Sequence, residues 1–297
     1  INTGAATGLG HPLDFSVSIQ GYEAPGTGPG TSLTVGGSWP AVTGLPSSIS
    51  ALKPRDGSDV LVLRYLAAEG VPVTALAPGA NSVVGFDGTI GKRLLEGGVT
   101  APTLFGVADC SHVNVFKGTY VEGQVTASGA NLDRYTVQPT GQTMIYRAES
   151  VVYFVGTSGT TGEPALMRAR SDGADGYATP EELVEGIENL QLLFGLDSTA
   201  AITSTTPPTG NITTVAIASG VSTGTNAAAA AQWRRVGQVQ VGILARSPQP
   251  SQAEAATDAL RYPRMLGVGF APSTPNDARY RAAYESTIAL RNRLFGN

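Results

Sequence analysis

Short stretches in which apolar and polar side chains alternate recur along much of this 297-residue chain. A period of two is typical of β-strands that bury one face. Residues 15–22 alternate in this way, and residues 59–65 form a compact apolar run that predicts a buried strand. Further strands are expected at residues 103–108, 113–119, 143–155, 164–170 and 236–243. The pattern therefore predicts a protein built mainly from strands.

Helices are expected at only two places, and both are short. Residues 179–182 offer a capping threonine, a proline in the first turn and a glutamate that completes a capping box. Residues 187–196 then continue as a strand, although their period alone leaves a longer helix open. Residues 277–284 are expected to make one or two helical turns before a final strand.

Long segments of turn-forming or low-complexity composition separate the expected strands. Residues 156–163 consist largely of turn residues and predict a hairpin link. Residues 198–231 are a low-complexity Thr/Ala/Gly insertion, and residues 247–277 are a Pro-rich excursion. Helices and strands do not alternate regularly, which argues against a doubly wound sheet. We predict a single globular domain over residues 1–297.

The composition narrows the classes of function. Hydrophobic residues make up 41% of the chain, which argues against general disorder, whereas charged residues make up only 14%. The formal net charge is −4 and the chain has no cluster of cations. Nucleic-acid binding needs clustered cations that neutralise phosphates, so we predict no nucleic-acid partner.

The sequence has neither a disulfide pattern nor a membrane-spanning segment that would indicate the cellular compartment of the protein. Cys110 is the only cysteine, so no intrachain disulfide can form, and we expect it to be a small buried apolar side chain. No run of 18 or more apolar residues occurs, so the sequence as given is not expected to span a membrane. It begins at Ile1 rather than at a methionine, which favours removal of an upstream segment.

Residues 157–164 resemble the phosphate-binding loop of adenylate-forming enzymes, whose backbone amides cradle ATP phosphates. That family has a lysine after the proline, whereas Ala165 stands at this position here. The later adenylate-contacting motifs are absent, and the chain is too short for the two-domain enzyme. The favoured interpretation is a hairpin turn without a bound nucleotide.

The histidines give little support for catalysis. Only His11 and His112 occur, and a Ser-His-Asp triad needs a histidine held by a carboxylate beside a presented serine. Residues 109–112, Asp-Cys-Ser-His, bring these residue types together in the sequence only. We predict no catalytic residue, no cofactor-binding residue and no enzymatic activity.

Asp172 and Asp175 are the only weak candidates for metal ligands, in the sequence Asp-Gly-Ala-Asp-Gly. Calcium prefers six to eight oxygen ligands, and a helix-loop-helix site needs a terminal bidentate carboxylate at a set spacing. Glu181 and Glu182 lie nearby but off that spacing. A turn is favoured over a calcium site, and no Cys/His cluster supports zinc.

Two segments, residues 186–197 and 284–293, together resemble the C-terminal signature of the W-type minor pilin (PilW) of bacterial type IV pili. Other landmarks of that family follow in the same order. They lie at residues 19–23, 58–64, 109–111 with 115–116, 162–168, 183–197, 233–246 and 288–293. The landmarks extend from about residue 15 to the C-terminus, and their order makes the resemblance more specific than any one of them.

The resemblance implies an α+β fold, a pilin-like head with an antiparallel sheet, short helices and long irregular insertions. The long N-terminal helix of the family, which would anchor the full-length protein in the membrane, is largely absent here. The implied function is assembly of type IV pili in a priming or tip complex. The implied partners are other minor pilins, the major pilin and a tip adhesin. The implied location is the inner membrane facing the periplasm, then the extracellular pilus, with roles in adhesion and twitching motility.

One departure and two alternatives accompany the resemblance. After Asp197 the family is expected to be acidic and glycine-rich, but Ser198-Thr199-Ala200-Ala201 follows, so no metal-binding loop is expected there. One alternative is the J-type minor pseudopilin of type II secretion, which shares the architecture. The other is a secreted surface-binding or adhesive module. In any of these, sheet edges are natural contact candidates.

Overall fold

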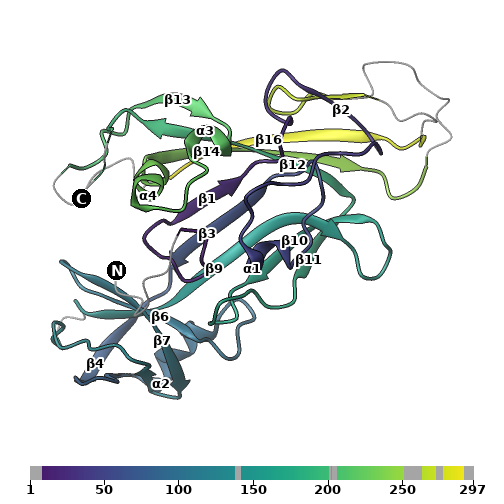
Figure 1. Cartoon of the computed structure of the whole chain (residues 1–297). Coiled ribbons are helices and arrows are strands. Elements are labelled where there is room, and N and C mark those ends of the chain that lie inside the picture. The colour runs from purple at the N-terminus through teal and green to yellow at the C-terminus, as the bar shows by residue number, and fades with distance from the viewer. Residues whose placement is uncertain are drawn as a thin grey trace. The chain divides into compact units, whose positions relative to one another are not determined.

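The computed structural model of the chain describes residues 9–137, 142–200, 202, 206–250, 263–271 and 277–290. Strands outnumber helices and pair mostly antiparallel, which confirms the β-rich α+β class (Figure 1). The structure divides into two compact units, and each is described by itself. The single domain over residues 1–297 and the pilin-like head stay predictions. No helix in the described ranges has the length and apolar character needed to cross a membrane.

Unit 1 contains the described residues of Ile1–Ser18, Leu63–Val151 and Arg170–Ala178. Its strands are β4 Val71–Ala77, β5 Val83–Phe86, β6 Leu104–Ala108, β7 Val113–Val121, β8 Gln124–Ala127 and the first part of β9 Met144–Thr157. The short helices α2 Gly88–Gly91 and η1 Lys92–Leu95 follow β5. The antiparallel pairing runs β9-β4-β5-β8-β7-β6 and returns to β9, so these strands form a closed ring.

The interior of this ring is an apolar core. It consists of Val71, Val73, Val84, Phe86, Leu94, Phe105, Val107, Phe116, Val125, Ala127, Leu132, Tyr135 and Ile145. Phe105 and Phe116 face each other across β6 and β7 with ring centroids 6.3 Å apart. Inward side chains come from every second residue of each strand, as the pleat requires.

Unit 2 contains the described residues of Ile19–Val62, Val152–Ala169 and Thr179–Asn297. Its four-stranded antiparallel sheet has the order β13 Ile212–Ala216, β12 Ile187–Asp197, β14 Val236–Arg246 and β16 Arg281–Ala289 (Figure 1). β12 lies between two neighbours and is buried along nearly its whole length. A strand buried on both faces has no apolar-polar alternation, which explains why the period of 187–196 left a helix open.

The remaining elements of unit 2 lie before the strands of this sheet in the sequence or between them. They are β1 Ile19–Tyr22, β2 Ser32–Thr34, α1 Ser47–Ser50, β11 Glu181–Glu185, α3 Ala218–Val221, α4 Ala227–Arg234 and β15 Gly269–Ala271. β3 Val60–Leu66, β9 and β10 Pro164–Arg170 are cut by the division between the units. The fully buried Trp233 of α4 packs edge-on against Phe194 of β12, with ring centroids 5.1 Å apart.

Both helix predictions are wrong. Residues 181–185 form β11, which pairs antiparallel with β10. Across this pair, Arg168 Nη2 donates a hydrogen bond to Glu181 Oε2 at 2.6 Å. Residues 281–284 begin β16, which pairs with β14. In each case the hydrogen bonds and contacts of a neighbouring strand outweigh the local preference for a helix. The rest of the expected final strand, residues 291–293, lies outside the described residues.

The low-complexity segment 198–231 contains regular structure that its composition did not predict. β13 pairs with β12, and α3 and α4 follow it. Asn226 caps α4, since its side chain accepts a hydrogen bond from Ala229 N. Residues 201 and 203–205 lie outside the described part. The Pro-rich segment 247–277 contributes β15, which pairs parallel with β2.

Candidate functional site

Residues 109–112 form a tight turn between β6 and β7. Asp109 Oδ1 accepts hydrogen bonds from Ser111 N at 2.7 Å and His112 N at 2.6 Å. Burial opposes the charge of Asp109, but these bonds outweigh it and lower the pKa of the carboxyl. His112 Nδ1 lies 3.6 Å from Asp109 Oδ1, and the His112 side chain is 49% exposed. Asp109, Ser111 and His112 are therefore close together because they form one turn.

The prediction that Cys110 is buried is wrong. The side chain is exposed, because Cys110 is the second residue of this turn rather than part of the preceding strand. The turn directs its own polar groups inward to the Asp109 carboxylate. The thiol of Cys110 is therefore free for modification by solvent reagents.

Asp172 and Asp175, the two metal-ligand candidates, contact different groups. Asp172 Oδ1 accepts hydrogen bonds from Ala174 N at 2.7 Å and Gly176 N at 3.3 Å, as in a turn. Asp175, whose side chain is 91% exposed, lies with Oδ1 3.2 Å from His11 Nε2. Across the ranges that the structure describes, no group of three or more His, Cys, Asp or Glu side chains is arranged to hold a metal ion.

The loop at residues 157–164 is a hairpin turn, as predicted. Ser158 N donates to Glu163 O at 2.7 Å, and Ser158 Oγ accepts from Thr160 N and Thr161 N, both at 3.3 Å. The loop joins β9 to β10, which pair with each other. Its amides near Ser158 are thus engaged within the turn.

Buried polar groups of unit 2 instead gather around β12. The Asp59 carboxyl, which is 1% exposed, accepts hydrogen bonds from Ala24 N at 3.0 Å and Leu192 N at 2.8 Å. Asp59 N donates in turn to Leu190 O at 2.9 Å. One residue thereby ties together the segment after β1, the start of β3 and the middle of β12.

The residues just before Asp59 extend this polar framework. Ser58 Oγ accepts a hydrogen bond from Leu190 N at 3.1 Å. Gly57 O accepts from Asn189 Nδ2 at 2.7 Å and from Gln191 Nε2 at 3.0 Å. Gln191 Nε2 also donates to Asn189 Oδ1 at 2.9 Å. A satisfied network of buried polar groups fixes the position of β12 more specifically than apolar contacts would.

Glu23 adds a second buried carboxyl beside Asp59. Glu23 accepts hydrogen bonds from Thr27 Oγ1 and Ala218 N, each at 3.3 Å. Burial outweighs these bonds and raises the pKa of Glu23 to about 7. Burial, and then the charge of Glu23, raise the pKa of Asp59 well above its ordinary value. The two carboxyls therefore resist being ionised together.

A network of ion pairs lies where β14 ends and β16 begins. The side chains of Glu188 and Arg281 are fully buried, and Arg281 Nε lies 2.6 Å from Glu188 Oε2. Arg246 Nη1 contacts Glu188 Oε1 at 3.2 Å, and Arg281 Nη2 contacts Asp277 Oδ2 at 2.5 Å. Each of the two buried charges thus has an opposite charge within contact distance, which buried ions require.

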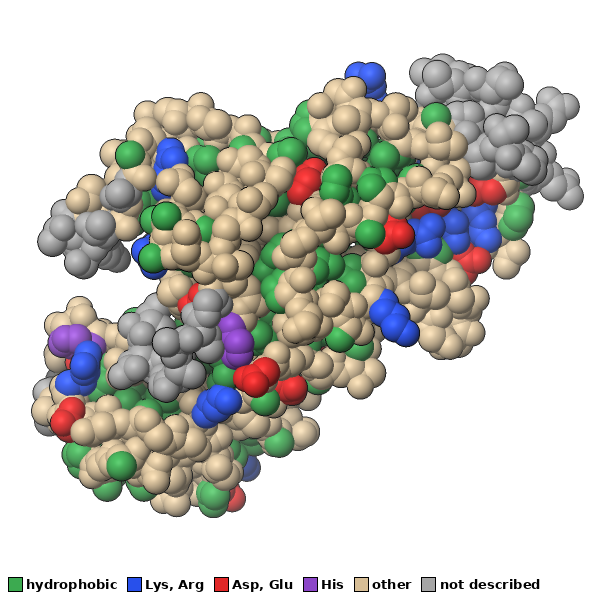
Figure 2. Space-filling view, in the orientation of Figure 1, with side chains coloured by type: hydrophobic (Ala, Val, Ile, Leu, Met, Phe, Trp, Pro, Cys, Tyr) green, Lys and Arg blue, Asp and Glu red, His purple; other side chains and the backbone are tan. Residues whose placement is uncertain are grey.

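Glu163 of the β9–β10 hairpin completes this network. Arg246 Nη2 pairs with Glu163 Oε2, and Arg279 Nη2 lies 3.0 Å from Glu163 Oε1. The ion-pair network consists of Glu163, Glu188, Arg246, Asp277, Arg279 and Arg281. Its three arginines and three carboxylates balance in charge. Blue and red side chains gather beside the end of β14 on the right of Figure 2.

The arginines shift the pKa values of their partners. Hydrogen bonding by Arg246 lowers the pKa of Glu163, and hydrogen bonding by Arg281 lowers the pKa of Asp277. Burial disfavours the charge of Arg281, but its bonds to Asp277 and Glu188 outweigh burial and raise its pKa. These shifts favour the charged forms of Glu163, Asp277 and Arg281.

Asp197 organises the loop at the other end of β12. Its carboxylate accepts hydrogen bonds from Thr199 N at 2.8 Å, Thr209 N at 3.2 Å and Gly210 N at 2.7 Å. Burial opposes the charge, but bonds from Thr199 and Thr209 outweigh it and lower the pKa of Asp197 to about 2. Asp197 thus holds Thr199 close to Thr209 and Gly210.

The segments that build the ion-pair network lie in the second half of the chain, from Glu163 to Arg281. Residues 152–292 match the model of the family Type IV Pilus-assembly protein W. The predicted resemblance to PilW is confirmed over these residues. Comparisons of the chain with curated proteins and with solved structures find no match.

Residues 152–292, called the PilW region below, contain the signature-like segment 186–197, whose polar side chains have structural contacts. Within residues 186–197, Glu188 belongs to the ion-pair network, Asn189 and Gln191 belong to the polar framework, and Asp197 holds the following loop. Each polar side chain of this strand named here has a structural partner. These polar side chains of β12 therefore hold neighbouring segments in place around the strand.

One feature of the sequence could have predicted the ion-pair network. Glu188 is a charged residue in a run that was expected to be a strand across the sheet, and a buried carboxylate needs a cationic partner. That requirement directs attention to the arginines of the second half of the chain, Arg246 and Arg281 among them. The sequence did not show which arginine would reach it.

Gly186→Ala is expected to destabilise the PilW region by about 1–3 kcal/mol. Gly186 has a φ of +84°, and a Cβ would lie 2.9 Å from Arg246 O. Gly159→Ala is the control, because its Cβ would meet no atom within 4 Å, and it should change stability by less than about 0.5 kcal/mol. Urea unfolding of both variants measures the difference, and equal losses would contradict the prediction.

Proposed function

We propose that the protein is a non-enzymatic minor pilin that takes part in type IV pilus assembly, in a priming or tip complex with other minor pilins. The match of residues 152–292 to the Type IV Pilus-assembly protein W family carries this proposal. Further support comes from the structural roles of the signature residues, which stabilise a sheet. A protein of this kind acts by packing against neighbours.

In this proposal an N-terminal helix anchors the full-length protein in the inner membrane. The head described here faces the periplasm before assembly and lies at the tip of the extracellular pilus afterwards. Its partners are other minor pilins, the major pilin and a tip adhesin. Adhesion and twitching motility depend on it indirectly, through the number of assembled pili.

Deletion of the full-length gene in the source bacterium is expected to abolish or strongly reduce surface pili. Electron microscopy of shed filaments and a twitching assay measure the effect. Complementation with the intact gene should restore pili, whereas a gene lacking the codons for residues 152–292 should not. Restoration by the truncated gene would overturn the proposed role of the PilW region.

The same deletion strain separates the two alternatives. Normal pili with exoproteins retained in the periplasm would identify a J-type minor pseudopilin of type II secretion. Normal pili and normal secretion would favour a secreted surface-binding or adhesive module. For that module, a ligand that raises the unfolding temperature of the purified chain is the expected finding.

A further inference from the structure

Three strands at sheet edges in unit 2 differ in how their outer edges are protected. β11 carries three glutamates, and its pairing with β10 is irregular between Leu166 and Met167. The pairing of β13 with β12 is irregular between Leu196 and Asp197. Edge charges and bulges both discourage the addition of another strand. β11 and β13 therefore show devices that hinder pairing with a further chain.

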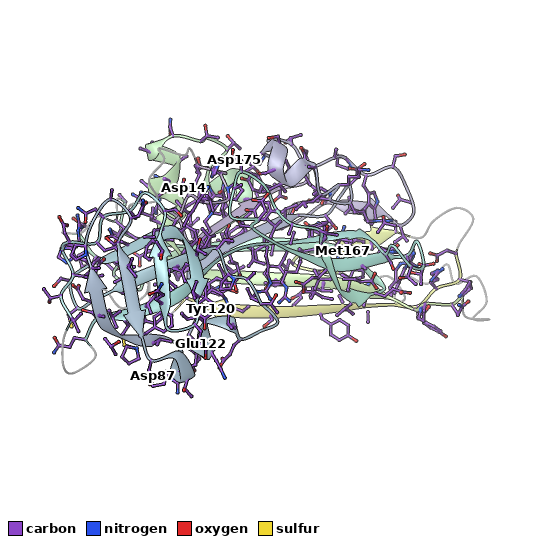
Figure 3. The ribbon with its side chains drawn as sticks, turned by 90° about the horizontal axis from the view of Figure 1, so that it is seen from below. Asp14, Asp87, Tyr120, Glu122, Met167 and Asp175 are labelled. Carbon is purple, nitrogen blue, oxygen red and sulfur yellow. The ribbon has the colours of Figure 1, made fainter. Side chains whose placement is uncertain are left out.

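β16 has neither device. Its pairing with β14 is regular from Arg281 to Ala289, with no shift of register. Between these two residues the strand contains no Pro, Lys or Arg, and its one charge, Glu285, accepts a hydrogen bond from Leu266 N at 2.6 Å. Among the described residues, no strand pairs with the outer edge of β16. Figure 3 shows β16 in yellow along the margin of its sheet.

The side chains of β16 make this edge apolar. Tyr284 is 63% exposed and Ile288 is 50% exposed, and both lie on the same face because they are four residues apart in a strand. Directly opposite them on β14 are Ile243 and Val239. A further strand beside β16 would cover Tyr284 and Ile288 and extend the apolar face.

The backbone of β16 is ready for such a strand. Leu290 N donates to Gly237 O, and Ser247 N donates to Tyr280 O, so even-numbered residues of β16 point their backbone groups at β14. The N–H and C=O groups of alternate residues in a strand point to opposite sides. The backbone groups of Ala283, Glu285, Thr287 and Ala289 therefore point away from β14.

We propose that β16 pairs antiparallel with β16 of a second copy of this chain, across a two-fold axis at Ser286. In this register Tyr284 lies opposite Ile288 of the second copy, and the reverse pair forms on the other side of the axis. An aromatic side chain opposite a β-branched one is a favourable cross-strand pair. Glu285 lies opposite Thr287, whereas an axis at Glu285 would place two like charges opposite each other.

The pairing is isologous, so the same patch serves both copies and the assembly closes as a dimer. It joins the two four-stranded sheets into one continuous sheet. The inference goes beyond the proposed function and does not depend on it, because it rests only on the edge of β16. A failure of pilus assembly and a failure of dimer formation are therefore measured separately.

Sedimentation velocity over a wide concentration range tests the proposal on the 297-residue chain. The unaltered chain is expected to form a concentration-dependent dimer. Ile288→Lys should weaken dimer formation at least tenfold. Val215→Lys is the matched control, because Val215 is 47% exposed on β13, the opposite edge of the same sheet, and should leave the dimer intact. Both side chains are exposed, so both variants should keep the unfolding temperature of the parent.

A disulfide reports the register. In a Cys110→Ser background, Ser286→Cys should cross-link to its own copy under mild oxidation, since the axis places the two cysteines directly opposite. Val215→Cys in the same background should not. A chain that stays monomeric at all concentrations, a dimer unaffected by Ile288→Lys, or a dimer broken by Val215→Lys would overturn the proposal.

Discussion

Replacing Arg281 by leucine is expected to destabilise the protein by about 3–5 kcal/mol. The side chains of Arg281 and Glu188 are both fully buried and lie 2.6 Å apart. Loss of the guanidinium leaves Glu188 with only the contact to Arg246 at 3.2 Å, and removes the cation beside Asp277. Removing the cation costs more stability than the ion pair contributes in net terms. The carboxylate stays buried, and its desolvation penalty is no longer compensated.

The control for this prediction is an exposed ion pair. Arg93 lies 3.9 Å from Glu69, and the two side chains are 50% and 58% exposed. Arg93→Leu should cost less than about 1 kcal/mol, because solvent screens the pair. Chemical unfolding of both variants gives the comparison. Similar losses for Arg281→Leu and Arg93→Leu would show that the ion-pair network does not stabilise the buried charges as described.

The Arg281→Leu variant should also respond differently to acid. The folded pKa of Asp277 lies below its ordinary value of 3.8, so this carboxylate stabilises the fold above that pH and the contribution is lost as the pH falls. Hydrogen bonding by Arg281 is the first cause of the lowered pKa. The variant should therefore lose less stability than the parent when the pH is lowered through this range.

Asp59→Ala is expected to destabilise unit 2 by roughly 2–6 kcal/mol, since two buried backbone N–H groups would each lose an acceptor at about 1–3 kcal/mol. These groups are Ala24 N and Leu192 N. Asp59→Asn should cost less, because the amide oxygen keeps one of the two bonds. Thermal unfolding of the three proteins measures the order, and a loss for Asp59→Asn equal to that for Asp59→Ala would contradict the hydrogen-bond explanation.

The pH dependence of the unaltered protein provides a second measurement on this pair. Burial raises the pKa of Glu23 from 4.5 to about 7, so the folded state holds a proton that the unfolded state has released between these values. The stability that this group contributes is complete below pH 4.5 and is lost as the pH rises to about 7. Glu23→Gln should make the unfolding temperature less dependent on pH between these values. An unchanged slope in the variant would contradict the assignment to Glu23.

The local features of this fold could be predicted from the sequence. The compact run at 59–65 and the alternation at 236–243 correspond to β3 and β14, and the turn residues at 156–163 correspond to the β9–β10 hairpin. These features depend on neighbours in the chain, because a strand period and a turn composition are local properties. The ordered landmarks likewise indicated PilW, and the family comparison confirmed it over residues 152–292.

The predictions that failed concern residues whose conformation depends on distant partners. The capping signals at 179–182 are locally sound, but pairing with β10 makes the following residues a strand. Cys110, predicted to be a small buried side chain, is exposed by the turn at Asp109. β13, in a segment of low complexity, forms only because β12 offers a partner edge. Strand pairing is a non-local interaction, so no short window of sequence reveals it.

By itself, the sequence determined that the protein is rich in strands, that it resembles PilW and that the signature-like segments lie at residues 186–197 and 284–293. Only the tertiary structure decided what the signature does. The ion-pair network unites Glu163, Glu188, Arg246 and Arg281 from a hairpin and three strands of one unit. The outer edge of β16 likewise becomes visible only when the sheet is assembled. Burial and pairing are properties of the folded chain, and they decide which charges need a partner and which edge is left free.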